Sequence, residues 1–197
     1  TCDLLNRRVL RLDMIKIVVL DEADRMLDMG FIKDVEFIIK ATPNKRQTLM
    51  FCATLPKEIQ HIINRHMHDP KLIKAKEHVD KELLKQYYYD ITVRNRFHLL
   101  VYLLKQERAP YAIVFCGTRR AVDLIAYNLD KNGINARAIH GGLTQSRRKQ
   151  VIDSFHGKST QILVASDIAA RGLDIKMLSH VYNFDVPKTA KEYIHRI

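Results

Sequence analysis

Four consecutive residues near the start of the chain could act on a phosphate ester: Asp21, Glu22, Ala23 and Asp24. They directly follow an apolar, β-branched run at 15–20, a pattern typical of a strand buried on both faces. Open α/β sheets bind ligands at the carboxyl ends of their strands. There, Asp21 could hold Mg²⁺, usually through water, while Glu22 orients the attacking water and takes its proton. A solvated acidic loop is the alternative, and the position after a strand argues against it.

A hydroxyl and a thiol follow the next predicted strand, at 48–51. Cys52, Ala53 and Thr54 come before Leu55 and Pro56, which open a predicted helix. The strand order places this segment at the same sheet edge as the acids, where its side chains could hydrogen-bond to the acidic loop. Capping of the helix by Thr54 is the alternative, and the two readings are compatible.

A third candidate segment, 165–174, follows an apolar strand in the second half of the chain. Ser166 could donate a hydrogen bond to a phosphate oxygen, and Gly172 permits a close backbone approach. Asp174 could accept from a ribose hydroxyl, and the guanidinium of Arg171 matches a carboxylate or phosphate. Alternatively, Arg171 and Asp174 only pair with each other across a turn.

Two further segments pass from a strand into a turn of small residues and then a helix. His140, Gly141 and Gly142 precede a helix start that carries Gln145 and two arginines, a combination that suits a phosphate. His140 as a satisfied core histidine, with the glycines forming only a turn, is the alternative. The other segment is Phe115-Cys116-Gly117-Thr118, in which Thr118 is expected to cap a helix.

These segments need two series of alternating strands and helices to position them, which predicts an α/β fold with parallel sheets. We expect a first domain at 1–76, a polar linker at 77–85 and a second domain at 86–197. Further strands are predicted at 86–92, 112–115, 136–139, 161–165 and 180–184. Helices are predicted around the apolar stripes at 35–39, 59–67 and 97–104, and at 118–132, 144–155 and 189–197.

Composition limits the classes of partner. The chain has 197 residues, 47% of them hydrophobic, and a formal net charge of +11, which favours a globular protein with a polyanionic partner, nucleic acid first. No apolar stretch approaches the roughly 20 residues of a membrane span. Cys2, Cys52 and Cys116 form neither a zinc motif nor a disulfide framework. We expect a soluble intracellular protein, in the cytoplasm, with no membrane partner.

The motifs, taken in order, resemble those of the DEAD-box RNA helicases. Residues 19–31 resemble the second motif of that family, and 51–56 resemble its Ser-Ala-Thr motif. Four more similarities follow in the family's order: 113–118 to motif IV, 145–148 to the Gln-x-x-Arg element, 166–174 to motif V, and 193–197 to the opening of motif VI. Six similarities in one order across nearly the whole chain make chance negligible.

The resemblance implies two RecA-like lobes that close on ATP, Mg²⁺ and single-stranded RNA. It implies that Asp21 serves Mg²⁺, that Glu22 is the hydrolytic base, and that Asp24 links Thr54 to His195, with Cys52 in the coupling motif. It places Asp174 and Arg171 on the nucleotide. It also implies contacts to the RNA backbone, with little sequence preference, from Thr118, Gly141, Gln145, Arg148 and Ser166.

The chain departs from the family pattern in three ways. Cys52 stands where the family usually has serine, a stronger hydrogen-bond donor, which bears on coupling. No Gly-x-x-x-x-Gly-Lys-Thr/Ser loop occurs, and motif VI stops before its later arginines. We therefore expect an internal piece of a helicase, its first lobe incomplete at the N-terminus and its second at the C-terminus, that alone hydrolyses ATP negligibly.

Other classes of function stay open at this point. A non-catalytic RNA-binding protein could keep the two lobes without the phosphate loop, and a DNA helicase or translocase could share the wider superfamily. A basic ribosomal protein would account for the charge but not for the motifs. The RNA substrate, the cellular pathway, the oligomeric state and protein partners are not predicted.

Overall fold

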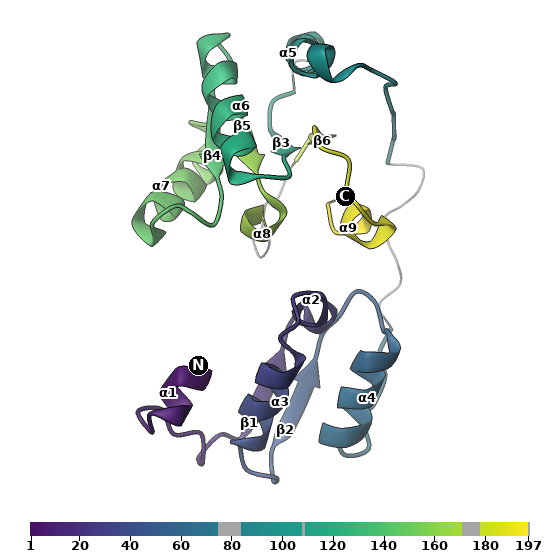
Figure 1. Ribbon diagram of the computed structural model, residues 1–197, viewed down its shortest axis with the longest axis vertical. Coiled ribbons are helices and arrows are strands. Elements are labelled where there is room, and N and C mark those ends of the chain that lie inside the picture. The colour runs from purple at the N-terminus through teal and green to yellow at the C-terminus, as the bar shows by residue number, and fades with distance from the viewer. Residues whose placement is uncertain (75–83, 108, 171–177, 197) are drawn as a thin grey trace. The chain divides into compact units, whose positions relative to one another are not determined.

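The computed structural model describes residues 1–74, 84–107, 109–170 and 178–196. Their contacts divide the chain into two compact units, Thr1–Leu84 and Lys85–Ile197 (Figure 1). Each unit contains a parallel β-sheet with helices packed on it, so the predicted α/β class is confirmed. Most of the linker expected at 77–85 lies outside the described residues.

Unit 1 is built on two strands. In register, β1 (Ile17–Leu20) pairs with β2 (Gln47–Met50), so that Leu20 lies beside Met50. The helices are α1 (Cys2–Asn6), α2 (Ala23–Asp28), α3 (Ile32–Lys40) and α4 (Lys57–His66). The apolar stripes predicted at 35–39 and 59–67 lie in α3 and α4. The core that they form with β1 and α2 consists of Leu20, Ala23, Val35, Ile39, Ile59 and Ile62.

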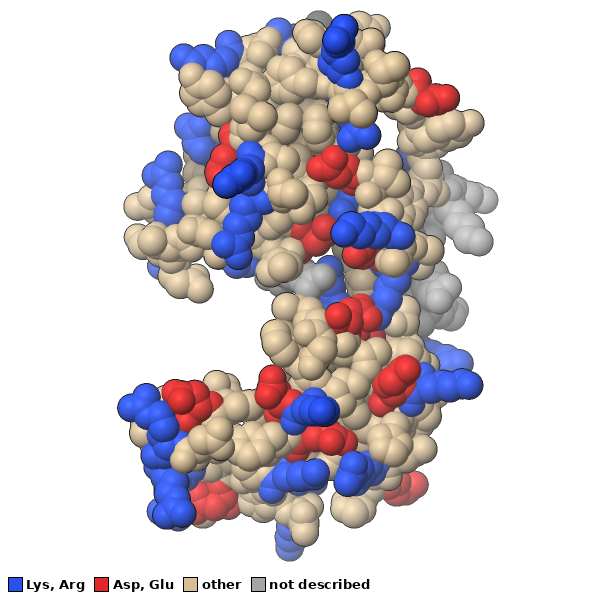
Figure 2. Space-filling model, in the orientation of Figure 1, with Lys and Arg blue, Asp and Glu red and all other residues tan. Residues whose placement is uncertain are grey.

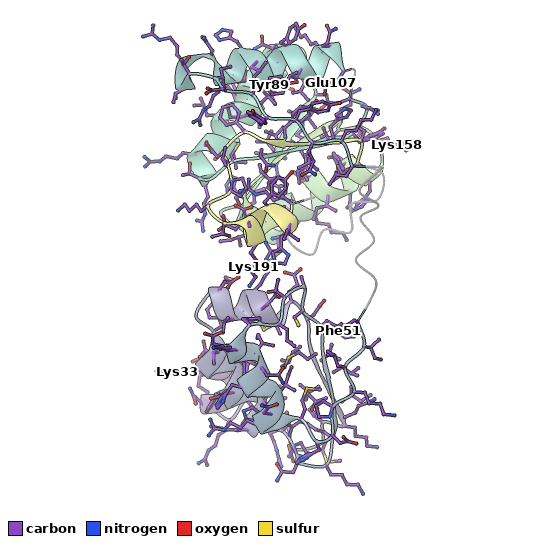
Figure 3. The ribbon with its side chains drawn as sticks, turned by 90° about the vertical axis from the view of Figure 1, so that its right-hand side faces the viewer. Lys33, Phe51, Tyr89, Glu107, Lys158 and Lys191 are labelled. Carbon is purple, nitrogen blue, oxygen red and sulfur yellow. The ribbon has the colours of Figure 1, made fainter. Side chains whose placement is uncertain are left out.

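The prediction that the first strand is buried on both faces is wrong for the described structure. Ile17 and Val19 are 55% and 54% exposed, whereas Leu20 is buried. Successive side chains of a strand point to opposite faces, so only alternate residues of β1 reach the core. Phe51, 55% exposed, lies on the uncovered side, opposite the helices (Figure 3). An apolar run therefore predicts the strand but not how many layers cover it.

Unit 2 holds four parallel strands in the order β4-β5-β3-β6. They are β3 (Ala112–Phe115), β4 (Ala136–Ile139), β5 (Ile162–Ala165) and β6 (His180–Asn183), each within one residue of its predicted bounds. Helices α5 (Arg96–Gln106) and α6 (Arg119–Lys131) cover one face. The other face is covered by α7 (Gln145–His156) and α8 (Asp167–Ala170). The described residues of this unit also form the short η1 (Val93–Asn95) and α9 (Ala190–Ile194).

Threonine side chains begin three of these helices. The Oγ atoms of Thr118, Thr144 and Thr189 accept hydrogen bonds from backbone N–H groups in the first turns of α6, α7 and α9, at 3.1, 3.3 and 3.1 Å. At the other end of α6, Gly133 has a φ of +75°. This left-handed conformation ends the helix, and it costs little because glycine has no Cβ. The cap predicted at Thr118 and the helix predicted at 118–132 are thus confirmed.

The strand predicted at 86–92 is wrong. Residues 84–92 form neither strand nor helix, and Tyr87 and Tyr88 are 76% and 93% exposed. The segment contains three consecutive tyrosines, a residue type with high β-propensity. Propensity alone does not make a strand, because the strand also needs a hydrogen-bonded neighbour and a packed face.

No helix among the described residues combines the length and the apolar character needed to cross a bilayer.

Candidate functional site

The acidic loop of unit 1 leaves the sheet directly beside the end of β2. The backbone ladder continues past the strands, because the N–H of Phe51 donates to the carbonyl of Leu20 at 2.8 Å and that of Ala23 donates to the carbonyl of Phe51 at 3.0 Å. The residues after β1 and those after β2 therefore share one sheet edge, as the sequence predicted.

Glu22 has the most unusual backbone of this edge. Its φ of 49° and ψ of 44° place it in the left-handed region, which is uncommon for a residue with a side chain. Neighbouring groups hold it there, since its N–H donates to Asp21 Oδ1 at 2.9 Å and its carboxylate accepts from Arg25 Nη1 at 3.2 Å. Strained backbone that its surroundings enforce is concentrated at functional sites.

Asp24 lies fully buried under the loop, at 0% exposure. Its Oδ2 accepts two hydrogen bonds from Thr54, one from the backbone N–H at 3.0 Å and one from the hydroxyl at 2.7 Å. The predicted bond between this segment and the acidic loop is therefore present. Two donors on one carboxylate oxygen fix the position of the segment after β2 relative to the acids.

The alternative role of Thr54 as a helix cap is wrong. Helix α4 begins at Lys57 with Pro56 as its N-cap, and the hydroxyl of Thr54 is directed to Asp24. Cys52 is half-buried and packs against the core of unit 1, where a sulfur atom fits an apolar environment.

The residues at this edge fit a divalent cation only if other molecules supply most of its ligands. Among the described residues, no group of three or more His, Cys, Asp or Glu side chains could hold a metal ion. Mg²⁺ keeps several waters and binds through one or two carboxylates together with phosphate oxygens. The exposed Asp21 carboxylate meets that requirement.

In unit 2, Thr118, Gly141 and Ser166 lie at one sheet edge. They follow the neighbouring strands β3, β4 and β5, and the ladder extends to them because the N–H of Ser166 donates to the carbonyl of Ile139 at 3.2 Å. Gln145 and Arg148 lie in the first turn of α7 at the same edge. The five residues that the resemblance assigns to RNA are thus brought together.

The edge of unit 2 is rich in arginine. Arg119 and Arg120 begin α6, and Arg147 and Arg148 lie in the first turn of α7. One donor of Arg148 is used within the protein, by a 3.1 Å bond to the carbonyl of Ala169. Figure 2 shows Lys and Arg side chains over the part of unit 2 where Figure 1 places α6 and α7. Cations beside helix N-termini attract phosphate groups.

His140 fits the core alternative given from the sequence. It is 7% exposed, its Nε2 lies 2.9 Å from Asp123 Oδ1, and its Nδ1 accepts from the N–H of Gly142 at 3.1 Å. Both ring nitrogens are therefore satisfied inside the protein, and the ring itself is not presented to a ligand.

Arg196 is a buried residue that lies in the segment resembling motif VI, although the sequence analysis assigned it no role. It makes two bonds to Asp167, at 2.6 and 2.9 Å, and further bonds to Asn183 Oδ1 and to the carbonyl of Asp185. Its guanidinium also lies 4.8 Å from the ring centroid of Phe115. The motif VI segment contains Arg196, but no local pattern links it to Asp167, which lies 29 residues earlier in the chain.

A buried thiol lies near the same cluster. Burial, and next the negative charge of Asp185, raise the pKa of Cys116 to about 12, although Arg196 opposes this. Cys116 therefore stays protonated at neutral pH and serves packing rather than nucleophilic chemistry.

The remaining predicted site residues are described less fully. His195 follows α9, is half-buried, and its N–H donates to the carbonyl of Lys191 at 3.1 Å. Arg171, Gly172 and Asp174 lie outside the described residues, so their predicted contacts stay predictions.

Comparison with known families identifies both parts of the chain. Residues 1–62 match the DEAD/DEAH box helicase family, and residues 95–197 match the helicase conserved C-terminal domain. The chain belongs to the DEAD-box helicases. The resemblance drawn from the motifs is therefore confirmed for both parts of this DEAD-box chain.

Individual relatives agree with this assignment. An ATP-dependent RNA helicase CshA of Listeria monocytogenes is 47% identical over 197 residues, which cover 99% of this chain but 38% of the relative. The structure of yeast Dbp5 bound to RNA and ADP BeF3 matches with a TM-score of 0.84 and 29% identity, over 99% of this chain and 52% of that one. A DEAD box protein from the hyperthermophile Methanococcus jannaschii matches with a TM-score of 0.57 and 41% identity, over 100% of this chain and 53% of that one.

Proposed function

We propose that the protein is an ATP-dependent RNA helicase, which couples ATP binding and hydrolysis to local unwinding of RNA duplexes or remodelling of RNA–protein complexes. The observation that carries this proposal is the acidic edge of unit 1. There, a strained Glu22 stands between Asp21 and the buried Asp24 that Thr54 holds. The relatives that match this chain are named as ATP-dependent RNA helicases, which supports it.

In this proposal the acids of unit 1 act on the γ-phosphate of ATP. Asp21 holds Mg²⁺ through water, and the ion supplies charge neutralisation at the phosphates. Glu22 orients the attacking water and takes its proton, for which the enforced backbone and the contact with Arg25 give it a defined position. Asp24 is too buried for that role and instead holds the segment after β2 through Thr54.

The edge of unit 2 binds the RNA backbone. Hydroxyls on Thr118 and Ser166, the backbone beside Gly141, and the side chains of Gln145 and Arg148 contact phosphates and 2′-hydroxyls. These groups are common to every nucleotide, so we expect little sequence preference. The arginines at the starts of α6 and α7 supply the positive charge that such contacts need.

Other assignments follow the family resemblance. Asp174 and Arg171 bind the nucleotide, while Cys52, Thr54 and His195 couple hydrolysis to RNA binding. We also propose the division into a first lobe at 1–76, a linker at 77–85 and a second lobe at 86–197. The cytoplasmic location expected from the sequence stays a prediction.

The proposal is tested in the full-length protein by Glu22→Gln, with Glu58→Gln, an exposed acid of α4, as the matched control. Loss of the proton acceptor should lower RNA-stimulated ATP hydrolysis by about 10²- to 10⁴-fold, while ATP and RNA binding persist. Glu58→Gln should retain wild-type turnover. Normal turnover in Glu22→Gln would remove Glu22 from its role.

The same assay separates the alternative functions. Stimulation by single-stranded DNA as strong as by RNA would favour a DNA translocase. Binding of RNA without any ATP hydrolysis by the wild type would favour a non-catalytic RNA-binding protein.

A further inference from the structure

The turn between β4 and α7 is held by a side chain rather than by backbone bonds alone. The N–H of Leu143 donates to the carbonyl of His140 at 3.1 Å, which closes a four-residue turn. The imidazole of His140 folds over this turn and accepts the N–H of Gly142 on Nδ1. Directly after the turn, Thr144 caps α7. The position of the α7 start thus depends on the ring of His140.

The hydrogen bonds define where the proton of the ring lies. Because Nδ1 accepts from a backbone N–H, Nδ1 carries no proton, and the neutral ring has its proton on Nε2. Nε2 lies 2.9 Å from Asp123 Oδ1, an acceptor that favours this tautomer. Asp123 projects from α6, so one imidazole connects α6 to the turn before α7.

Steric fit adds to the hydrogen bonds. A Cβ placed on Gly142 would lie 3.0 Å from Nδ1 and 3.1 Å from Cε1 of His140, closer than ordinary contacts. The position of the His140 ring therefore requires glycine at position 142, because a side chain there would press on the ring. Arg119, also on α6, lies beside the same turn, since its Nη2 is 3.5 Å from the Cβ position of Gly141.

We propose that His140 is a positioning residue for RNA binding. Its ring, fixed by Asp123 in the tautomer with the proton on Nε2, holds the turn 140–144 in the shape that presents Gly141 and the start of α7 to the RNA backbone. This inference rests on the proposed function, because it names what orients the RNA-binding edge. His140 itself touches no RNA, since both its nitrogens are used inside the protein.

The test compares two substitutions that each keep one half of the ring's chemistry. His140→Asn keeps an acceptor near the position of Nδ1, and His140→Gln keeps a donor that can reach Asp123. ATP hydrolysis by the full-length protein is measured against the concentration of a short polyuridine strand. His140→Ala and His140→Gln should raise the RNA concentration for half-maximal rate by about tenfold, and His140→Asn by about threefold or less. The rate at saturating RNA should change by less than about twofold in all three variants.

A purely structural role gives a different pattern. If His140 only fills space, the larger Gln would replace it better than Asn, and that order would overturn the proposal. Unchanged RNA dependence in a folded His140→Ala, with folding checked by thermal melting, would also overturn it. His156→Ala, which removes an exposed histidine from the last turn of α7, is the matched control and should behave as wild type.

A second readout does not depend on RNA. Long-range proton–nitrogen NMR of the imidazole in the wild-type chain should show the proton on Nε2, and Asp123→Ala should weaken that preference. Finding the proton on Nδ1 would overturn the proposal, whatever the enzyme assay shows. If the tautomer is as expected and RNA does not stimulate the wild type, the proposed function fails and His140 only stabilises the turn.

Discussion

The acids at the sheet edges of the two units differ in how they are paired with cations. In unit 1, the buried Asp24 accepts two hydrogen bonds from Thr54, and the Glu22 carboxylate lies 3.2 Å from Arg25 Nη1. The exposed Asp21 has no cation in contact among the described residues. In unit 2, the acids at the edge are met by cations, because Arg196 binds Asp167 and Arg96 lies 3.3 Å from Asp185. Both of these acids of unit 2 are therefore paired with an arginine, whereas the exposed Asp21 of unit 1 is not paired with one among the described residues.

In the proposed function, this difference in pairing would account for the division of roles between the units. A negative edge attracts a divalent cation and can accept a proton from water. At the other edge, pairing of the acids leaves the arginines of α6 and α7 to act on a polyanion. In the proposed function, the same architecture would thus serve two chemistries, according to which acids are paired with cations inside the protein.

The substitution with the largest expected effect removes Arg196, the cation that pairs with Asp167 at the edge of unit 2. Arg196→Ala leaves the Asp167 carboxylate and the Asn183 side chain without a buried partner, so we expect a loss of about 3–5 kcal/mol in the free energy of unfolding of unit 2. Urea unfolding with hydrogen exchange of the β5 and β6 peptides measures it. Arg137→Ala, which removes an exposed ion pair with Asp130 in the same unit, should cost less than about 1 kcal/mol. Equal losses would show that Arg196 does not organise this edge.

The second prediction tests the neutral donors of unit 1. Asp24→Asn keeps the shape of the side chain but removes the charge that strengthens both bonds from Thr54, and we expect a loss of about 2 kcal/mol in unit 1. Hydrogen exchange should speed up at the Thr54 amide. Asp21→Asn, at the exposed end of the same loop, should change stability by less than about 0.5 kcal/mol. The comparison between the edges fails if both substitutions cost the same.

Glu36 is an acid of unit 1 that is paired with cations. Whether an acid is paired therefore depends on where it lies and not on which unit contains it. Burial disfavours its charged form, but the hydrogen bond with His66 and the charges of Arg65 and Lys40 outweigh burial, so the pKa of Glu36 lies below its usual range. A lowered pKa contributes stability that is present above the unfolded value of about 4.3 and is lost as pH falls through the folded value. This acid lies on α3, away from the edge.

The third prediction follows from the lowered pKa of Glu36. Between about pH 6 and about pH 3, wild-type unit 1 should lose more stability than the Glu36→Gln variant, which has no carboxyl to protonate at that position. Chemical unfolding at a series of pH values measures the difference. Glu58→Gln is the control, because Glu58 is exposed, and it should follow the wild type. Parallel pH curves for wild type and Glu36→Gln would contradict the role of the His66 and Arg65 contacts.

The parts of the fold that could be predicted are those that neighbouring residues determine. Runs such as 112–115 locate strands, and Thr118 and Thr144 locate helix starts, because a cap and its amides lie three residues apart. The Thr54 bond to Asp24 was predictable since both residues follow strands that had to be parallel neighbours. The family motifs supplied the roles that no local rule contains.

The parts that could not be predicted depend on contacts between distant residues. Arg196 meets Asp167 across 29 residues, and the left-handed backbone of Glu22 arises from its surroundings, whereas a sequence rule would place glycine there. The tyrosines at 87–89 show the converse, since a strong local signal produced no strand without a partner. Local signals thus predict elements, and long-range contacts decide charge pairing and burial.

The prediction with the smallest expected effect compares the two faces of the unit 1 sheet. In unit 1, Val18 of β1 packs on the core, whereas Val19 is 54% exposed. In unit 2, Val114 of β3 is fully buried in the core. Val→Thr keeps the volume and adds a hydroxyl, which is costly only where water is excluded. We therefore expect Val19→Thr to change the free energy of unfolding of the 197-residue chain by less than about 0.5 kcal/mol.

Val→Thr at the two covered positions shows how much free energy of unfolding is lost when the added hydroxyl is buried. Val18→Thr and Val114→Thr should each cost more than about 1 kcal/mol, with the greater loss at the fully buried Val114. Urea unfolding resolved by hydrogen exchange measures all three. A cost at Val19 as large as at Val18 would mean that both faces of β1 exclude water. The two sheets would then be covered alike, and the difference between the units would reduce to the charges at their edges.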